Sequence, residues 1–332
     1  MRKVSQNWVG VPAWIRTLLP LAALALLCPA PSRAQGARDA LSSFPADTQQ
    51  MVYSNLSDLR ALPDYSRVRQ WIFTPQLRRF EEFLRSMGTD PEKDVDEVTL
   101  GWRGDPATSS YFGLAEGRLN PDRVHDAAVQ QKVPIEQYNG YDLFSFNSNG
   151  SRDDIFFAFF DTSSAAFGRL SDLKALLDVR AGSRPALNSV TEFANGESEL
   201  EGAAPQWGIA RGSAAANQAA PWLTGGATIP GGTKAFISSV QWILYRFDWG
   251  GGFSMHMSVL CKDSKSATDL ANVLTLVRAA RPSTSASSAP ATQALFQGMN
   301  IQANESRVEV SASVPINLAD RFFGNSGTLP AP

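Results

Sequence analysis

The sequence has few residues that form disulfides or bind soft metals: two cysteines and two histidines among 332 residues. No His-x-x-x-His, Cys-x-x-Cys or His-x-Glu spacing occurs, so no zinc site is indicated. No Gly-x-Ser-x-Gly motif occurs either, and a serine hydrolase also needs a histidine and an acid beside its nucleophile. His125, next to Asp126 in a predicted helix, is interpreted as part of a solvated pair, with a catalytic base as the alternative. We therefore expect no metal and no cofactor.

An excess of basic residues is also missing. Lysine and arginine number 30 against 32 aspartates and glutamates, which gives a net charge of −2. Nucleic-acid binding depends mainly on lysine and arginine at phosphates, so we expect no nucleic-acid partner. Hydrophobic residues make up 43% of the chain and aromatic residues 10%, which excludes general disorder and predicts packed cores.

No apolar run reaches the roughly 20 residues that a membrane-spanning helix needs. The longest, residues 17–28, has the length of the apolar middle of a signal peptide; positive residues precede it and a small-residue cleavage site follows at 32–34. We predict that residues 1–34 are a signal peptide, cleaved after Ala34 to leave Gln35 first. The protein is then secreted or periplasmic, with no transmembrane span after cleavage. Retention of the segment as a membrane anchor is the alternative.

Cleavage at this position removes four basic residues and no acidic one, leaving 26 basic against 32 acidic residues and a net charge of about −6. It also removes Cys28, whose lipidation is disfavoured by the bulky Leu27 before it. Cys261 is then the single cysteine, so an internal disulfide is excluded. Because Cys261 ends an apolar strand, we expect a small buried hydrophobic residue, and a reactive thiol is the alternative.

The pattern of strands and helices occurs twice. Trp102 and Trp242, 140 residues apart, take the same place in the two copies. In the second copy, apolar alternation and then a 3.6-residue stripe predict strand, strand and helix at 234–247, 253–260 and 266–277. In the first copy the same series is predicted at 96–104, 110–119 and 120–131.

The element order in each copy predicts the fold class. A strand and helices precede each series, and a hairpin follows it; in the first copy the hairpin turns at Asn139-Gly140. This order is typical of ferredoxin-like folds. We predict an α+β protein with two ferredoxin-like repeats of the β-α-β-β-α-β type, antiparallel sheets and helices on one face. The predicted division is signal peptide 1–34, first repeat 41–185, second repeat 186–323 and disordered tail 324–332.

The opening of the mature chain, Phe44-Pro45-Ala46-Asp47-Thr48, carries a resemblance. Followed by a strand and later by the strand at Trp207-Gly208, it resembles a family of uncharacterised exported bacterial proteins, a domain of unknown function. Members of that family begin with Leu/Phe-Pro-Ala-Asp-Thr and carry a duplicated α+β body, and the likeness in layout covers most of residues 41–323. The resemblance implies export but no chemistry and no catalytic residue. By itself the motif is a proline-initiated turn that leads into a strand.

Two local patterns have both a chemical and a structural interpretation. Met255-His256-Met257, with Cys261 nearby, suggests a Cu(I) site. In a strand, however, His256 points away from both methionines, so core packing is favoured. The glycines at 250–252 suggest a phosphate loop but lack the following Gly-Lys-Ser/Thr, so a turn between strands is favoured. Aspartates and glutamates in predicted loops and helix faces are interpreted as solvated, with an acid–base pair as the alternative.

An aromatic group is the candidate binding site: Trp242, Tyr245 and Trp249 on one strand and its turn, and Trp102 in the matching strand. If one face of the sheet is open, these residues form a docking surface for an apolar ligand, a glycan or an envelope protein. If helices and the other copy cover both faces, they are core residues. We predict a non-catalytic ligand- or partner-binding module of the cell envelope. The alternative is a hydrolase with a carboxylate site at the junction of the two repeats.

Overall fold

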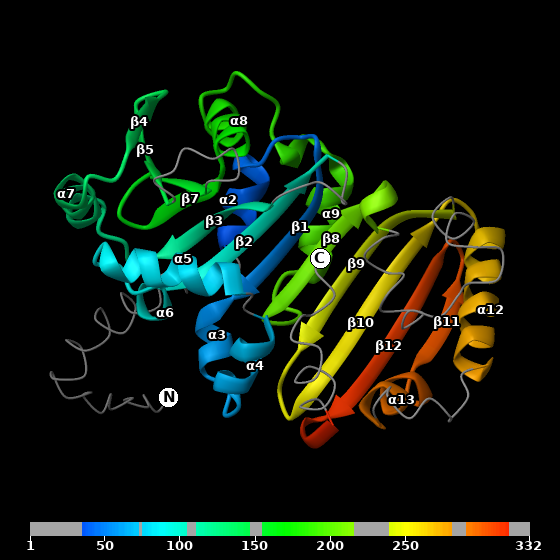
Figure 1. Ribbon diagram of the computed structural model, residues 1–332. Helices are drawn as coiled ribbons and strands as arrows, with labels where there is room; N and C mark the ends of the chain where they lie inside the picture. The colour runs from blue at the N-terminus through cyan, green and yellow to red at the C-terminus, as the bar shows by residue number, and fades with distance from the viewer. Residues whose placement is uncertain are drawn as a thin grey trace, which may run out of the picture.

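A single antiparallel β-sheet of 12 strands forms the centre of the molecule (Figure 1). This computed structural model describes residues 35–72, 75–104, 111–146, 155–215, 239–280 and 290–318. Within them, the strands lie side by side in the order β11-β12-β10-β9-β8-β1-β2-β3-β7-β6-β5-β4. The chain is thus an α+β protein whose two halves share one sheet, joined where β1 pairs with β8.

The strands have the following bounds: β1 Thr48–Asn55, β2 Val95–Arg103, β3 Tyr111–Gly117, β4 Ile135–Tyr138, β5 Tyr141–Ser145, β6 Ile155–Phe159, β7 Ser164–Arg169, β8 Gln206–Arg211, β9 Val240–Asp248, β10 Gly252–Cys261, β11 Asn300–Asn304 and β12 Arg307–Pro315. The helices have these: α2 Gln35–Ser43, α3 Leu56–Arg60, α4 Tyr65–Ile72, α5 Pro75–Ser86, α6 Pro91–Asp94, α7 Pro121–Gln131, α8 Leu170–Arg180, η1 Leu187–Ser189, α9 Thr191–Leu200, α12 Ser264–Ala280 and α13 Pro290–Gln297.

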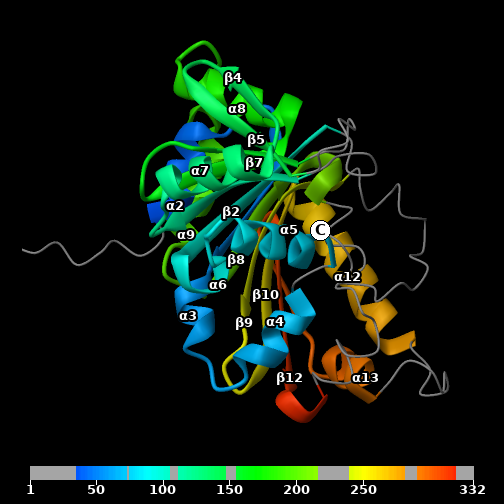
Figure 2. The same ribbon diagram turned by 60° about the vertical axis from the view of Figure 1, so that its left-hand side comes forward.

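Helices cover both faces of the sheet, not one face as the sequence predicted. Figure 2 shows α2 and α9 on one side of the sheet and α4 and α12 on the other. On the first side, α2, α8 and α9 pack on β1, β3 and β8 in one apolar cluster that includes Phe193 and Trp207. On the second side, α3, α4 and α12 pack in another cluster with Tyr245 and Met255. Both clusters take residues from both halves of the chain.

The predicted ferredoxin-like strand order is not present among the described strands. A split β-α-β unit has two parallel strands with a third strand between them. Here β1 lies directly beside β2 and antiparallel to it, with no strand between them, although four helices connect the two. A helical connection can join two neighbouring antiparallel strands as well as two parallel strands with another strand between them. The order of strands and helices in the sequence therefore did not decide which strands are neighbours in the sheet.

The strand order on the two sides of the β1–β8 pair is nevertheless the same in its main steps. Outward from β1 come β2 and β3, then β7 and β6, and finally the hairpin strands β5 and β4. Outward from β8 come β9 and β10, and then the hairpin strands β12 and β11. Only β6 and β7 have no counterpart among the described strands of the second side. The predicted boundary at 185/186 lies between α8 and η1 and interrupts neither the sheet nor the first apolar cluster.

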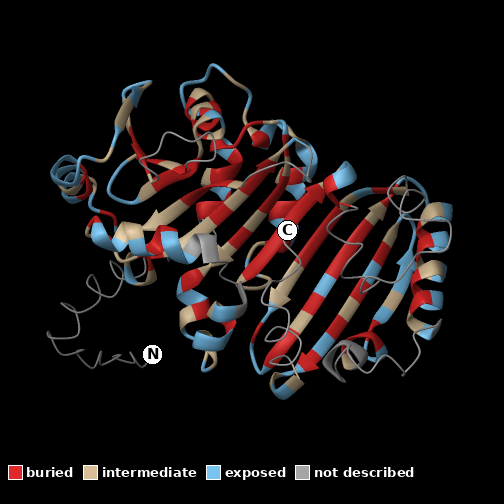
Figure 3. Cartoon of the chain, in the orientation of Figure 1, coloured by how far each residue is buried: buried red, intermediate tan, exposed pale blue. Residues whose placement is uncertain are grey.

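Burial changes from the centre of the sheet to its edge (Figure 3). Five of the six residues of β8 are buried, and the strand contributes to the apolar clusters on both faces, with Trp207 and Ile209 in the first and Ala210 in the second. On β12, buried and less buried residues alternate along the whole strand, the pattern of a sheet with one wet face. His256 and Glu309 belong to that wet face, while Met255 and Met257 are buried on the other.

Several local predictions are confirmed. The Asn139-Gly140 hairpin has the positive φ angles of 48° and 82° that its turn needs. The side chain of Asn120 accepts a hydrogen bond from the Arg123 amide (3.0 Å) and so caps α7. The Thr48 amide donates to the Pro45 carbonyl (3.0 Å), which closes the predicted proline-initiated turn.

One strand was missed by the sequence analysis, and some predicted segments lie outside the described residues. The strand β7 was not predicted, because Ser-Ala-Ala-Phe-Gly-Arg has little β-branched content and reads as a loop before the next helix. Three predicted segments lie outside the described residues: the strand residues 234–238, the signal segment 1–34 and the tail 324–332.

Candidate functional site

The four predicted aromatic residues do not form one exposed surface. Trp249 is 2% exposed, Tyr245 5% and Trp102 8%. The Trp249 ring contacts Phe253, with a centroid distance of 4.9 Å, and the Tyr245 hydroxyl accepts a hydrogen bond from Gln50 Nε2 at 3.2 Å. These contacts are those of core residues.

Trp102 and Trp242 lie on opposite faces of the sheet. Trp102 stands opposite Gln50 across the β1–β2 pair, and so it shares the face of Tyr245. Trp242 packs edge-on against Phe193 of α9, on the other face, with a centroid distance of 5.2 Å. The prediction that Trp102 and Trp242 take the same place in the two copies is therefore wrong. An offset of one residue along a strand moves a side chain to the opposite face of the sheet.

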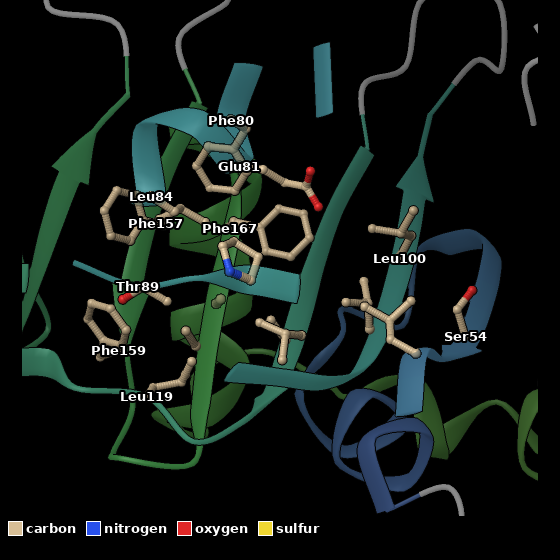
Figure 4. Close-up of a pocket in the computed structure, with 17 residues that line it drawn as sticks. Ser54, Phe80, Glu81, Leu84, Thr89, Leu100, Leu119, Phe157, Phe159 and Phe167 are labelled. Atoms are coloured by element: carbon tan, nitrogen blue, oxygen red, sulfur yellow. The ribbon is translucent and has the colours of Figure 1, made fainter. Parts of the chain in front are cut away.

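An apolar cavity lies between α5 and the sheet (Figure 4). It has a volume of about 140 Å³. From α5, Phe80 and Leu84 point toward the strands, and Phe157, Phe159 and Phe167 of β6 and β7 lie opposite them. The Phe80 ring stands 6.0 Å from Phe157 and 5.9 Å from Phe167 between centroids. These rings, together with α5, line a space that is partly open to solvent.

Small side chains form the floor of this cavity. Ala115 of β3 and Ala165 of β7 are directly opposite each other across the strand pair, and both line the cavity. A directly opposed pair of residues shares one face of a sheet. Two alanines at this place leave a space that leucine or phenylalanine side chains would fill.

Glu81 is the carboxylate that lines the same cavity. Its side chain is buried, and Arg69 of α4 forms an ion pair with it. Arg85, one turn further along α5, stands 4.0 Å away. Burial raises the pKa of Glu81, and the two arginines oppose that shift. A polar group on a bound molecule would therefore meet a paired carboxylate at this point of a mostly apolar wall, whose other polar side chains are Ser54 and Thr89.

A second group of titratable residues lies on the other face, under the start of α2. Glu97 of β2 and Glu116 of β3 are directly opposite each other in the sheet. The Gly36 amide of α2 donates a hydrogen bond to Glu97 Oε2 at 2.8 Å. Burial raises the pKa of both carboxyl groups; the pKa of Glu116 rises to about 8, because the charges of Asp39 and Glu97 add to the effect of burial.

The raised pKa of Glu116 predicts that the free energy of unfolding depends on pH. The prediction applies to a chain in which a neutral segment is joined to Gln35 by a peptide bond, so that no charged amine lies at residue 35. Folded Glu116 keeps its proton up to a pH of about 8, whereas the unfolded residue loses it near 4.5. Between these values the folded chain binds more protons, so the free energy of unfolding falls as pH rises. Urea unfolding at a series of pH values measures this slope. Glu116→Gln is expected to flatten it, and Glu305→Gln, an exposed carboxylate, is the control. An unchanged slope in Glu116→Gln would contradict the assignment.

A polar cavity of about 240 Å³ lies at the junction of the two halves. Its walls include Tyr53 and Asn55 at the end of β1, Asp58 of α3 and Asp248 at the end of β9. The loop before β8, residues 202–205, closes it on the remaining side. Two carboxylates thus border one cavity at the junction that the sequence analysis named for a hydrolase.

The positions of the histidines and of Cys261 bear on the alternative interpretations as a metal site, a catalytic base or a reactive thiol. His256 is exposed on the face opposite buried Met255 and Met257, so the three side chains do not converge. His125 Nδ1 lies 3.2 Å from Asp142 Oδ2 at the surface. No cluster of three or more metal-binding side chains occurs in the described ranges. Burial raises the pKa of the Cys261 thiol to about 11, which makes it a poor nucleophile.

Sequence reasoning missed the apolar cavity. The run 155–160 is apolar on both faces, which predicts a central strand, and Phe80, Phe83 and Leu84 are spaced as the apolar stripe of a helix. Neither pattern shows that the alanines of β3 and β7 stand under that stripe. The signal in the sequence for this cavity was the presence of small residues, Ala115 and Ala165, in two short apolar segments.

Comparisons with known proteins inform the fold alone. No protein-family model matches the chain, and no curated protein matches it. Among solved structures, crystal form I of TP0453 is similar, with a TM-score of 0.52 and 8% identity over 88% of this chain and 98% of that chain. Crystal form III of TP0453 gives a TM-score of 0.49 and 8% identity. At this identity, the first likeness is evidence of a shared α+β arrangement over most of the chain and of nothing further. Among the described residues no helix is both long and apolar enough to cross a bilayer.

Proposed function

We propose that this chain is an exported, non-catalytic binding module that holds an apolar ligand in the cavity under α5. The observation that carries the proposal is the wall of that cavity: aromatic and aliphatic side chains from α5, β2, β6 and β7, with one paired carboxylate. Binding sites for small molecules are concave and mostly apolar, with a few polar groups that fix orientation.

The volume of the cavity indicates the size of the bound group. An engineered cavity of about 150 Å³ lined by leucine, isoleucine and phenylalanine stays dry and binds benzene. The space of about 140 Å³ here is similar in volume and lining. The ligand that fits is therefore an aromatic ring or a short alkyl chain, and a polar end would lie toward Glu81 and Arg69.

Export is part of the proposal and comes from the sequence. The positive start, the short apolar middle and the small-residue site at 32–34 support cleavage of residues 1–34 and a secreted or periplasmic location. An apolar ligand of the envelope, or an envelope protein that delivers it, is the partner that this location and this cavity favour.

Toluene binding tests the proposal. We expect saturable shifts of the Ala115 and Ala165 methyl signals in ¹H–¹³C NMR spectra as toluene is added. Ala165→Phe fills the floor of the cavity and should weaken binding at least about tenfold, because the ring occupies the ligand's volume. Ala115→Leu is a second filling variant for the case that the first fails to fold.

The controls remove apolar surface elsewhere. Val129 and Leu276 are 59% and 60% exposed. Val129→Ala and Leu276→Ala should leave toluene binding unchanged, which shows that the signal does not arise from surface adsorption. Absence of saturable toluene binding in the unmodified chain would refute the proposal. Binding in both filling variants that is as strong as in the unmodified chain would also refute it.

We also propose that the two halves arose by duplication. The matching order of β1-β2-β3 and β8-β9-β10, each followed by an outer hairpin, supports it. In this view β6 and β7 are an insertion in the first half, and that insertion supplies Phe157, Phe159 and Phe167 to the cavity. The second half would then have no equivalent binding site.

A hydrolase is the second candidate, favoured by the polar cavity that Asp58 and Asp248 share at the junction of the halves. Paired carboxylates serve as acid and base in glycoside hydrolysis. A panel of p-nitrophenyl glycosides and esters tests it. Turnover that Asp58→Asn and Asp248→Asn each abolish would support this candidate, and no turnover would dismiss it.

A further inference from the structure

Two carboxylates under the start of α2 have no basic partner among the described side chains. Glu97 and Glu116 stand directly opposite each other, an arrangement that like charges make unfavourable. The negative charges of Asp39 and Asp161 act on Glu116, and those of Asp96 and Asp58 act on Glu97. The nearest basic side chain of α2, Arg38, is engaged elsewhere, with Glu201 and, at 3.7 Å, Glu197.

Buried polar groups beside this pair point to a missing cation. Tyr53 and Thr99 are 2% and 1% exposed, and they stand opposite each other one residue pair along the same face from Glu97. Thr99 Oγ1 and Glu116 Oε1 have no hydrogen-bond partner among the described residues. The Tyr53 hydroxyl lies beside Glu97, and burial together with the charge of that carboxylate raises the pKa of Tyr53. Buried polar atoms without a partner are rare in folded proteins and need an explanation. A group with several N–H donors would supply hydrogen bonds to Glu97 and Glu116 together.

The backbone at the start of α2 lies directly against the carboxylates. The Gly36 amide donates to Glu97 at 2.8 Å, and a methyl group on Gly36 would lie 2.8 Å from Glu97 Oε2 and 3.3 Å from Glu116 Oε2. Gln35, the residue before it, is the first residue of the helix and the first residue after the predicted cleavage site. Gln35 is exposed, and three backbone bonds separate its nitrogen from the Gly36 nitrogen, so the two nitrogens are at most about 4 Å apart.

We propose that hydrolysis of the Ala34–Gln35 peptide bond creates an α-ammonium group at Gln35 that Glu97 and Glu116 bind, so that removal of the signal segment completes the packing of α2. A signal peptidase adds water across the bond, which leaves a carboxylate on Ala34 and an ammonium on Gln35. The inference rests on the proposed export, and it concerns a site separate from the apolar cavity. The ligand of this acidic site is then the protein's own new N-terminus.

Two effects oppose the binding of an α-ammonium group at Gln35: the charge of the helix terminus and the cyclisation of an N-terminal glutamine. The N-terminus of a helix carries a partial positive charge, which disfavours a cation there. This effect is smaller than the attraction of two partly buried carboxylates at hydrogen-bond distance. An N-terminal glutamine can also cyclise: its amine attacks the side-chain amide carbon, a lactam forms and ammonia leaves. Binding to Glu97 and Glu116 keeps the amine protonated and without a free electron pair, so the bound N-terminus is protected from this reaction.

The test compares mature chains that differ only at the amine. One begins with free Gln35, and the other carries an Nα-acetyl group on Gln35. At pH 7 we expect an unfolding equilibrium constant about tenfold lower for the free amine, because acetylation removes the charge that Glu97 and Glu116 bind. In Glu116→Gln this difference should shrink to less than about twofold, whereas in Glu305→Gln, the exposed control, it should remain.

Further readouts separate the outcomes. The pKa of the Gln35 amine should rise above the usual value of about 7.7 to 8.0, and this rise should be lost in Glu97→Gln. Mass spectrometry of the exported protein identifies its first residue. A first residue other than 35, a mass lower by one ammonia, or equal stability of free and acetylated chains would each overturn the proposal. Toluene binding is measured independently, so failure at this site leaves the proposed binding function untouched.

Discussion

Replacement of Trp249 by alanine is expected to lower the free energy of unfolding by about 3 to 5 kcal/mol. The side chain is 2% exposed, and its ring contacts Phe253. Its Nε1 donates a hydrogen bond to Gln206 Oε1 at 3.2 Å, so the variant loses a buried hydrogen bond in addition to a large apolar volume. Urea denaturation followed by far-UV circular dichroism measures the change.

Trp242 and Leu276 provide the comparison for Trp249. Trp242→Ala should cost less, because the half-buried Trp242 packs mainly on one ring, that of Phe193. Leu276→Ala removes a side chain that is 60% exposed and should change the free energy by less than about 0.5 kcal/mol. Equal effects of Trp249→Ala and Trp242→Ala would contradict the assignment of Trp249 to the core, and would revive the docking-surface hypothesis for these aromatic residues.

A methyl group added at Gly208 is expected to destabilise the protein by about 1 to 3 kcal/mol. Gly208 lies in β8 at the seam of the two halves, opposite Tyr245 of β9. A Cβ atom there would stand 2.3 Å from Tyr245 Cζ and 2.4 Å from its hydroxyl oxygen. Tyr245 is buried and bonded to Gln50, so the ring cannot move aside without losing that contact.

Gly250→Ala is the matched control, because the added methyl would meet only Asp248 Oδ1, at 3.2 Å, on an exposed turn. We expect little change in the midpoint of thermal unfolding for this variant. Gly208→Ala combined with Tyr245→Val should be less destabilising than the sum of the two single changes, since the second removes the ring that the methyl meets. If the changes in the free energy of unfolding are additive, the added methyl group does not meet the Tyr245 ring and the proposed clash is wrong.

Sequence patterns predicted the local structure where the physical cause is local. The Asn139-Gly140 turn, the Asn120 cap and the turn at Pro45 depend on residues that are three or fewer apart, and the structure has all three. The α+β class follows in the same way, since strand and helix periods are properties of short segments. The weak strand β7 is the exception, because its pairing with β3 and β6 outweighs its low propensity.

Adjacency of distant segments was not predictable in this manner. The binding hypothesis was placed on Trp102 and the aromatic residues of β9, whose exposure depends on which helices pack over the sheet. The candidate cavity depends instead on α5 lying over Ala115 and Ala165, residues from two strands that are neighbours only in the folded sheet. Spacing in the sequence contains no information about that contact.

The amino-acid sequence alone determined the turns, the caps and most strands and helices, because each depends on neighbours along the chain. Tertiary structure alone decided that the halves share one sheet, that helices cover both faces, and that Glu97 and Glu116 meet beneath Gly36. These features arise when apolar faces far apart in the chain are buried together, which no short segment of the sequence specifies by itself.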